Sequence, residues 1–523
     1  MSSAAVIAAP APSRAPTLLR REAIVLAVLT VLALVLRLSS LSRSLFTDET
    51  YSLALAQRSF GQMLELFGWE ANGTPYSIVL WPLIRIFGSG VTLLRLPAVL
   101  AGTLSVPALW WAARRFTTPA AALLAAALLA VNPMAVWYSH EARAYAFVVL
   151  AACLAFGALP RALERRGSRR MWILYVAAMT LLAYSEIFAA PLALPAQALI
   201  AWRAGRDGVR RWLWSLLAVL VCCLPLAAAA VISRSRRDAL YWLPKTDRAL
   251  VTLTLQEFSA GFSGMTAVRW ATLAAAVVLV GAAGWVIART RSHAGAAPLA
   301  IALCWGLLPA AVLLIVSFVE PIFFPRYAIL SLPGLCLALA IAVEQLWHSR
   351  PGAVTAVAAV AVLLVAGGLA DARQRSYLQE DWPPIAAVLR AERAAGQPVI
   401  LDNALVLPSL GYYDPAFRAP GGQLVAQEWH DQPLPRGFVG FKDPSGYGSV
   451  PDGPPSAAEF ARLARLGGGS VWMIVSEVDL LLQENPREGA AVAWAHAHCH
   501  VQVHESVGVW LLHASHCAAS PLR

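Results

Sequence analysis

The sequence carries little charge for its length. Of its 523 residues only 14% are charged, 59% are hydrophobic, and the mean hydropathy is +0.61. A soluble protein of this size cannot bury so large an apolar fraction, so the composition excludes a soluble globular enzyme. The lipid bilayer is therefore the expected solvent for most of the chain.

Acidic residues are scarcer than basic ones, and the formal net charge is +11. The arginines cluster in short loops between apolar runs, at Arg114-Arg115, Arg161 to Arg170 and Arg203 to Arg211. This distribution is typical of cytoplasmic loops in membrane proteins rather than of a nucleic-acid-binding face. No nucleic-acid partner is expected.

Cysteine is also sparse. Five of the seven cysteines lie within apolar runs, where a thiol behaves as a small hydrophobe and indicates neither metal nor redox chemistry. Cys499 and Cys517 lie in the polar C-terminal part, and whether they form a disulfide stays open. The chain also lacks a phosphate-cradling Gly-rich loop and a dinucleotide fingerprint, which argues against a nucleotide ligand.

Long apolar runs dominate the first 370 residues and predict about eleven transmembrane helices. The runs are 22–39, 91–113, 118–134, 144–160, 171–183, 187–202, 212–232, 266–288, 297–319, 326–347 and 353–370. The predicted organisation is a cytoplasmic tail (1–21), a transmembrane domain (22–370) and a non-cytoplasmic C-terminal domain (371–523).

The arginine clusters orient this topology. With the N-terminus in the cytoplasm, alternation of the spans places these clusters in the cytoplasm as well. The main exception is the basic loop from Arg234 to Arg248, which falls outside. Residues 76–90 must then not cross the bilayer, and Pro82 and Gly88 suit a juxtamembrane or re-entrant element.

The composition after Asp371 changes to Pro, Gly and charged residues, which predicts a small α/β domain. A helix is expected from Trp382 to Ala394, strands at 398–407 and 470–478, and a hairpin at 498–513. The alternation of His496, His498 and His500 would place all three on one strand face. A solvated face is the simpler interpretation of that pattern than a metal site.

Two adjacent carboxylates, Asp48 and Glu49, follow the first apolar run and precede an amphipathic segment expected to lie along the membrane surface. A carboxylate at the mouth of a membrane cavity can deprotonate an incoming hydroxyl or bind a divalent cation. The alternative is structural, because Thr47 or Asp48 can cap the N-terminus of the following helix.

The segment 138–145, Tyr-Ser-His-Glu-Ala-Arg-Ala-Tyr, places polar side chains between two apolar runs. Arg143 can bind a phosphate or a carboxylate, and Glu141 or His140 can orient an acceptor or hold a metal. Tyr145 offers a face to a sugar ring. An interfacial aromatic belt with a surface ion pair is the alternative.

Arg326 and Tyr327 open a late apolar run on the predicted non-cytoplasmic side, against the positive-inside tendency. An arginine there suits the phosphate of a lipid-linked donor. Simple snorkelling of Arg326 to the headgroups is the alternative.

Taken in order, these motifs resemble the GT-C superfamily of membrane glycosyltransferases. The resemblance is to its bacterial polyprenyl-phosphate-sugar family, which includes protein O-mannosyltransferases and aminoarabinose transferases, and it covers about residues 45–390. The matching motifs are Asp48-Glu49, Arg95-Leu96-Pro97, Glu141 with Arg143 and Tyr145, and Arg326-Tyr327 followed by Leu332-Pro333.

The resemblance implies an inverting transfer of one sugar from a polyprenyl-phosphate donor to an acceptor on the non-cytoplasmic face. It implies Asp48 as general base and Glu49 and Glu141 as carboxylates near the acceptor. Arg143 and Arg326 would bind the donor phosphate, and His140, Tyr145 and Tyr327 would line the site. The partners are the lipid-linked donor, membrane lipid and a protein, lipid or glycan acceptor in a bacterial plasma membrane.

No organic cofactor is implied, and a divalent cation at Asp48 or Glu141 stays open. Two other classes also stay open. A transporter or flippase should carry charges at mid-span, whereas here they lie near the membrane faces. A non-catalytic sensor would need far fewer than eleven spans for anchoring.

Overall fold

The structure is a computed structural model. It describes residues 16–65, 73–164, 168–228, 246–290, 293–394, 397–401, 406–418, 422, 424, 438–439, 457–476 and 486–517. Contacts divide the chain into two compact units. Unit 1 comprises 1–41, 70–76 and 95–377, and unit 2 comprises 42–69, 77–94 and 378–523.

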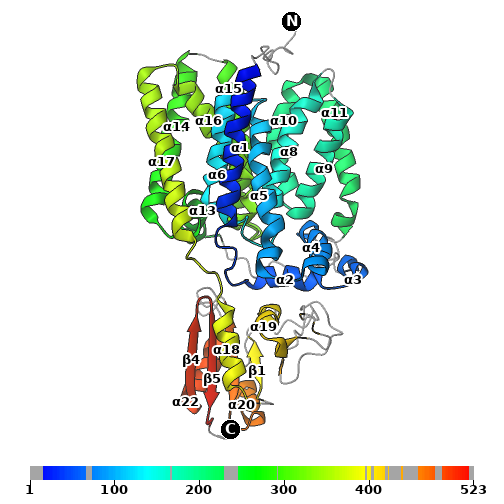
Figure 1. Ribbon diagram of the computed structural model, residues 1–523, viewed down its shortest axis with the longest axis vertical. Helices are drawn as coiled ribbons and strands as arrows, with labels where there is room; N and C mark the ends of the chain where they lie inside the picture. The colour runs from blue at the N-terminus through cyan, green and yellow to red at the C-terminus, as the bar shows by residue number, and fades with distance from the viewer. Residues whose placement is uncertain are drawn as a thin grey trace. The chain divides into compact units, whose positions relative to one another are not determined.

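Unit 1 is a helical bundle (Figure 1). Its α-helices are α1 (Pro16–Leu38), α5 (Val91–Ala113, whose first turn belongs to unit 2), α6 (Pro119–Val131), α7 (Pro133–Trp137), α8 (Tyr145–Leu163), α9 (Arg169–Ser185), α10 (Ala189–Arg203), α11 (Gly205–Cys222), α13 (Arg248–Ala260), α14 (Thr266–Thr290), α15 (His293–Val316), α16 (Ser331–Leu346) and α17 (Arg350–Gln374). Among the described residues, the 3-10 turns η2 (Gly261–Ser263) and η3 (Pro325–Ala328) interrupt the series.

A helix is present at each of the eleven predicted runs within the described residues, but the number of spans is not confirmed. Among the described residues, five helices are long and apolar enough to cross a bilayer: α5, α8, α14, α15 from Ala296, and α17. The helices α6 and α16 are apolar but shorter. Short spans must tilt less, thin the bilayer or rely on their neighbours.

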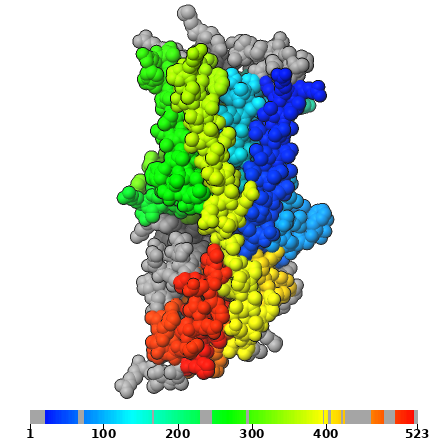
Figure 2. Space-filling model, turned by 60° about the vertical axis from the view of Figure 1, so that its left-hand side comes forward, coloured from blue at the N-terminus to red at the C-terminus, as the bar shows by residue number. Residues whose placement is uncertain are grey.

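The outer surface of unit 1 is apolar, as lipid contact requires. Figure 2 shows one face of the bundle, on which α17 lies beside α14. Val277 of α14 and Val354 and Val365 of α17 are more than half exposed. Water would penalise this exposure, whereas hydrocarbon does not. The protein is therefore a multi-pass membrane protein.

Several predicted cytoplasmic connections of unit 1 contact one another. Arg115, after α5, pairs with Glu164, after α8, at 2.5 Å. Arg211 of α11 donates to the carbonyl of Leu163 at 3.3 Å. The amide of Thr118, before α6, donates to Glu344 of α16 at 3.3 Å. The arginine-rich connections after α5, α8 and α10 thus lie at the same end of the bundle.

In the part of unit 2 that the structure describes, three helices come from the first hundred residues, and the rest is a C-terminal α/β domain. The early helices are α2 (Thr47–Ala56), α3 (Phe60–Glu65) and α4 (Thr74–Phe87, whose first turn belongs to unit 1). The C-terminal elements are α18 (Trp382–Glu392), β1 (Val399–Leu401), α19 (Leu407–Tyr413), η5 (Pro415–Phe417), β2 (Phe438–Val439), α20 (Ala457–Leu466), β3 (Val471–Ser476), α22 (Pro486–His498), β4 (His500–Ser506) and β5 (Val509–Ser515).

The C-terminal domain has three layers around a sheet of strand order β2-β1-β3-β5-β4. The pairs β1–β2 and β1–β3 are parallel, and β3–β5 and β4–β5 are antiparallel. On the central strand, Trp472 and Ile474 pack with α18 and α19, whereas Val471 and Met473 pack with α20 and α22. Coverage of both faces explains the uninterrupted apolar run of β3.

The sequence predictions for this domain are confirmed in part. The helix from Trp382, the strand at 470–478 and the terminal hairpin are present. The strand expected at 398–407 ends at Leu401 among the described residues, and Leu407 begins a helix because Pro408 suits its first turn. The prediction that His496, His498 and His500 share one strand face is wrong, because His496 and His498 lie in the last turn of the helix α22 and only His500 lies in a strand.

Two predictions concern the early helices of unit 2. The helix α4 has 14 residues and a length of about 21 Å, too short to cross about 30 Å of hydrocarbon by itself. The prediction that an amphipathic helix after Asp48 lies along the membrane surface is wrong for α2, because nine of the ten side chains of α2 are buried. Most of the basic loop 234–248 lies outside the described residues.

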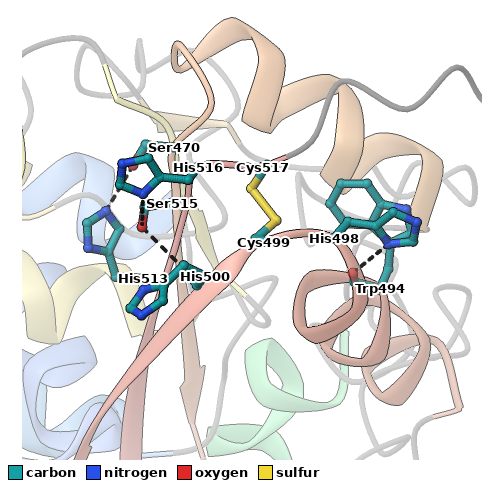
Figure 3. Close-up of a disulfide and its surroundings, with 9 residues drawn as sticks. All are labelled: Ser470, Trp494, His498, Cys499, His500, His513, Ser515, His516 and Cys517. Atoms are coloured by element: carbon teal, nitrogen blue, oxygen red, sulfur yellow. Dashed lines mark hydrogen bonds between the residues drawn. A yellow bond between two sulfur atoms is a disulfide. The ribbon is translucent and has the colours of Figure 1, made fainter.

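Cys499 and Cys517 form a disulfide, the question that the sequence left open (Figure 3). The bond joins the residue before β4 to the residue two positions after β5, so it closes the open end of the hairpin. Nearby, the His513 side chain stacks on Trp472 at 3.7 Å and shares a 2.9 Å hydrogen bond with Ser470. Burial lowers the pKa of His513, which favours the neutral ring in this packed position.

Thiol counting tests the disulfide. Unfolded, unreduced full-length protein should take up five alkyl labels, and reduced protein seven, because only Cys499 and Cys517 are paired. Loss of an 18-residue cross-link should cost about 3 kcal/mol of unfolding free energy in Cys499→Ser. Seven labels without reductant would contradict the pairing.

Candidate functional site

The polar turn between α7 and α8 is the centre of the candidate site in unit 1. Asn132 ends α6 and also caps α7, because its Oδ1 accepts the Ala135 amide at 2.9 Å. Pro133 then starts a helix of only five residues. The chain turns sharply here, and it brings Trp137, Tyr138 and Glu141 inward, all buried.

A buried guanidinium holds this turn against α1 and α6. Arg37, only 1% exposed, donates to the carbonyls of Ala33, Leu129 and Ala130 and, at 3.1 Å, to Ser139 Oγ. A buried charge is tolerated only with such partners. Sequence analysis did not select Arg37, because an arginine at the end of an apolar run resembles an ordinary snorkelling residue.

Two carboxylates meet the aromatic side chains of the turn. Trp137 Nε1 donates to Glu141 Oε1 at 2.7 Å, and Tyr138 Oη donates to Glu257 Oε2 at 3.0 Å. Glu257 comes from α13 and is 2% exposed. Sequence analysis missed it, although an acid among the apolar residues of α13 is the signal that could have found it.

The electrostatics of this group reflect its burial. Burial raises the pKa of Glu257 to about 7, although the Tyr138 hydrogen bond and the Arg326 charge both lower it. Burial, with the Glu257 and Glu141 charges, also holds the pKa of Tyr138 well above its usual range. Glu257 therefore changes charge near neutral pH, whereas Tyr138 remains a hydrogen-bond donor.

Aromatic rings surround Arg326, which η3 presents. Its guanidinium lies 4.8 Å from the Phe324 ring, 5.8 Å from Tyr145 and 6.0 Å from Tyr327. Tyr145 in turn packs edge-on against Tyr138 at 5.0 Å. Arg326 is also near enough for its charge to act on Tyr138 and Glu257. A cation among ring faces suits an anionic ligand with a sugar attached.

The structure thus brings three of the predicted residues, Glu141, Tyr145 and Arg326, together around Tyr138. A fourth, Tyr327, lies beside Arg326. Arg143 lies half-buried in the same turn. His140 is placed differently, because its Nε2 donates to the carbonyl of Leu36 at 3.2 Å. That carbonyl lies in the last turn of α1, where helices leave acceptors without intrahelical partners.

Asp48 and Glu49 belong to unit 2 and occupy the first turn of α2. Neither Thr47 nor Asp48 is the N-cap, because Phe46 holds that position and makes no side-chain cap. Glu49, 1% exposed, instead accepts the Phe46 amide at 3.3 Å. Asp48 is only partly buried. The two neighbouring carboxylates therefore differ in environment, with Glu49 engaged in closing its own helix end.

Within the ranges that the structure describes, no three His, Cys, Asp or Glu side chains lie close enough together to hold a metal ion.

One family profile matches the chain. The family described as dolichyl-phosphate-mannose-protein mannosyltransferase matches residues 75–232, which include the turn with Glu141, Arg143 and Tyr145. Comparison with curated proteins gives no match.

Solved structures share the fold over nearly the whole chain. ArnT from Cupriavidus metallidurans, solved bound to undecaprenyl phosphate, is 15% identical with a TM-score of 0.54, covering 95% of this chain and 98% of ArnT. Its apo form gives a TM-score of 0.55. The archaeal oligosaccharyltransferase AglB from Archaeoglobus fulgidus is 12% identical with a TM-score of 0.51, covering 95% of this chain and 74% of AglB. The resemblance to GT-C membrane glycosyltransferases is thereby confirmed.

The pKa of Glu257 predicts a pH dependence of stability. An acid whose pKa is raised in the folded state favours folding while protonated, and that stability is lost as the pH rises through about 7. Wild-type protein in detergent should therefore lose thermal stability from about pH 5 to about pH 8 more steeply than Glu257→Gln.

A second variant separates this effect from other titrations. Tyr138→Phe removes a hydrogen bond that lowers the Glu257 pKa, so the loss of stability should move to higher pH. Parallel stability curves for wild type and Glu257→Gln would contradict the assignment.

Proposed function

We propose that this protein is a glycosyltransferase that moves a single sugar from a polyprenyl-phosphate donor to an acceptor on the non-cytoplasmic face of the membrane. The fold and the matching family profile support the class of reaction. The donor class follows the relatives, since ArnT was solved with undecaprenyl phosphate and AglB with a dolichol phosphate.

The observation that carries this proposal is the setting of Arg326. A guanidinium among the rings of Phe324, Tyr145 and Tyr327, beside a carboxylate that titrates near neutrality, suits a phosphate carrying a sugar. The phosphate would bind Arg326, with Arg143 of the adjoining turn as a second cation. The rings of Tyr145 and Tyr327 would contact the sugar.

Asp48 is the proposed general base. It takes the proton of the acceptor hydroxyl, whose oxygen then forms a bond to the anomeric carbon. The bond from that carbon to the phosphate oxygen breaks, and its electron pair leaves with polyprenyl phosphate. One direct displacement inverts the anomeric centre, and only the base and a stabilised leaving group are needed.

The remaining site residues take supporting roles. Glu49 closes the N-terminal turn of α2 and keeps its neighbour Asp48 in place. Glu141 holds Trp137 and is the proposed acceptor-side carboxylate. His140 donates a hydrogen bond to the Leu36 carbonyl in the last turn of α1, so we assign it a structural role in the turn. A divalent cation would act through Asp48 or Glu141, the hard oxygen ligands that such ions prefer.

Two independent features support the proposed orientation. The disulfide between Cys499 and Cys517 is typical of an oxidising compartment, which favours a non-cytoplasmic C-terminal domain. The arginine-rich connections at one end of the bundle favour a cytoplasmic position for that end. A bacterial plasma membrane suits both.

Removing the base tests the proposal. Asp48→Asn should lower sugar transfer by about 10²–10⁴-fold and leave donor binding nearly unchanged. The measurement is transfer of radiolabelled sugar from a panel of polyprenyl-phosphate monosaccharides to membrane extracts, at matched expression.

The control is Asp207→Asn, the same chemical change at an exposed ion pair with Arg210. It should transfer sugar at the wild-type rate. Wild-type activity that survives in Asp48→Asn would remove Asp48 from the mechanism. The absence of transfer from any donor would contradict the proposed function itself.

A further inference from the structure

The N-terminal turn of α2 obtains some of its hydrogen-bond acceptors from the C-terminal domain. The first amides of a helix need acceptors from outside the helix. Phe46, the N-cap, supplies no side-chain acceptor. The amide of Thr47, at the first helical position, donates instead to Glu380 Oε2 at 2.9 Å, across 333 residues of sequence.

The Glu380 carboxylate is the centre of this contact. It is 6% exposed, and its Oε2 also accepts the Thr47 hydroxyl at 2.8 Å and Trp382 Nε1 at 2.6 Å. Bonds to a carboxylate are stronger than neutral ones. A negative charge at a helix N-terminus gains further from the helix dipole. Asp48 directly follows Thr47, the residue that Glu380 holds.

A second element of the domain holds the residues on either side of Asp48. Tyr413 of α19 accepts the Leu45 amide at 2.6 Å, and Ser409 of α19 shares a 2.8 Å hydrogen bond with Thr50. The segment from Leu45 to Thr50 is therefore attached at three points to residues 380–413.

Glu380 itself is held by the terminal hairpin. The amide of Asp381 donates to Val507 O at 2.9 Å, and Ser506 Oγ donates to Asp381 O at 2.9 Å. Gly508, at φ +69°, has no Cβ, and one placed there would lie 2.1 Å from Gln379 O. The β4–β5 turn thus fixes the backbone on both sides of Glu380.

We infer that Glu380 is a positioning residue for Asp48, and that the C-terminal domain is thereby part of the catalytic apparatus rather than an appended module. The inference rests on the proposed role of Asp48 as general base. Displacement of a reacting group by about 1 Å can cost on the order of 100-fold in rate. Glu49 closes this turn only at the Phe46 amide, so the Thr47 amide beside Asp48 depends on Glu380 for its acceptor.

The test compares Glu380→Gln with Glu392→Gln in the full-length protein. The first substitution keeps the shape of the side chain but removes its charge, whereas Glu392 is a partly exposed acid of the same domain, 3.9 Å from His504. Glu380→Gln should lower kcat by about 10–100-fold with little change in the donor KM. Glu392→Gln should match wild type.

A milder pair of variants distinguishes loss of the Glu380 hydrogen bonds from a general failure to fold. Thr47→Val removes only the hydroxyl bond to Glu380, whereas Thr47→Ser keeps both donors. Thr47→Val should reproduce the kcat defect in weaker form, and Thr47→Ser should keep the wild-type rate. In each variant, five labels without reductant and seven with it would show that the Cys499–Cys517 bond has formed.

Amide hydrogen exchange provides a readout independent of activity. A peptide covering residues 44–52 should exchange faster in Glu380→Gln than in wild type or Glu392→Gln. Unchanged exchange would overturn the inference, and so would faster exchange with an unchanged kcat. If wild-type protein transfers no sugar from any donor, the proposed function fails, and the exchange result still decides whether Glu380 holds the turn.

Discussion

The helical bundle is organised around the buried Arg37 guanidinium, which needs hydrogen-bond acceptors inside an apolar environment. Arg37 is almost fully buried at the end of α1, and hydrocarbon offers it no hydrogen bonds. Its guanidinium binds two carbonyls of α6 and the Ser139 hydroxyl of the turn before α8. Gly102 of α5 leaves the space, since a Cβ there would lie 2.0 Å from Ser139 Oγ. Three helices and the polar turn are therefore fixed relative to one another by a requirement of the bilayer.

Because Arg37 holds this turn inside the bundle, the polar side chains of the turn are buried, and burial sets their pKa values. Tyr138 and Glu141 lie within two residues of Ser139 in the sequence, and Tyr138 donates a hydrogen bond to Glu257 of α13. Burial keeps Glu257 near its titration point and Tyr138 protonated. Arg326 then faces rings and a carboxylate that can become neutral, which would lower the competition for the donor phosphate proposed to bind Arg326. Unit 2 also contains a buried charge that is held by hydrogen bonds, but there the charge is negative. The Glu380 carboxylate accepts from the amide and the hydroxyl of Thr47 at the start of α2.

Local patterns made much of this predictable from the sequence. Helices lie at the apolar runs because hydrophobicity of spanning length is a local signal, and the hairpin follows from alternation. Glu141, Tyr145 and Arg326 were selected as candidates because charged and aromatic side chains stand out at the ends of apolar runs. Glu257 and Glu380 were not, because each gains its role from a partner 119 or 333 residues away. The burial of α2 was missed for the same reason, since its covering residues come from the C-terminal domain.

In the proposed reaction the lipid-linked donor is cleaved rather than carried across the membrane. The most direct measurement uses purified protein in proteoliposomes with a labelled polyprenyl-phosphate monosaccharide and acceptor membranes, following both release of polyprenyl phosphate and passage of intact donor between leaflets. A glycosyltransferase should release free polyprenyl phosphate in proportion to the sugar transferred, and intact donor should pass between leaflets no faster than in protein-free liposomes. Rapid passage of intact donor without cleavage would contradict the proposed reaction and establish a lipid transporter instead.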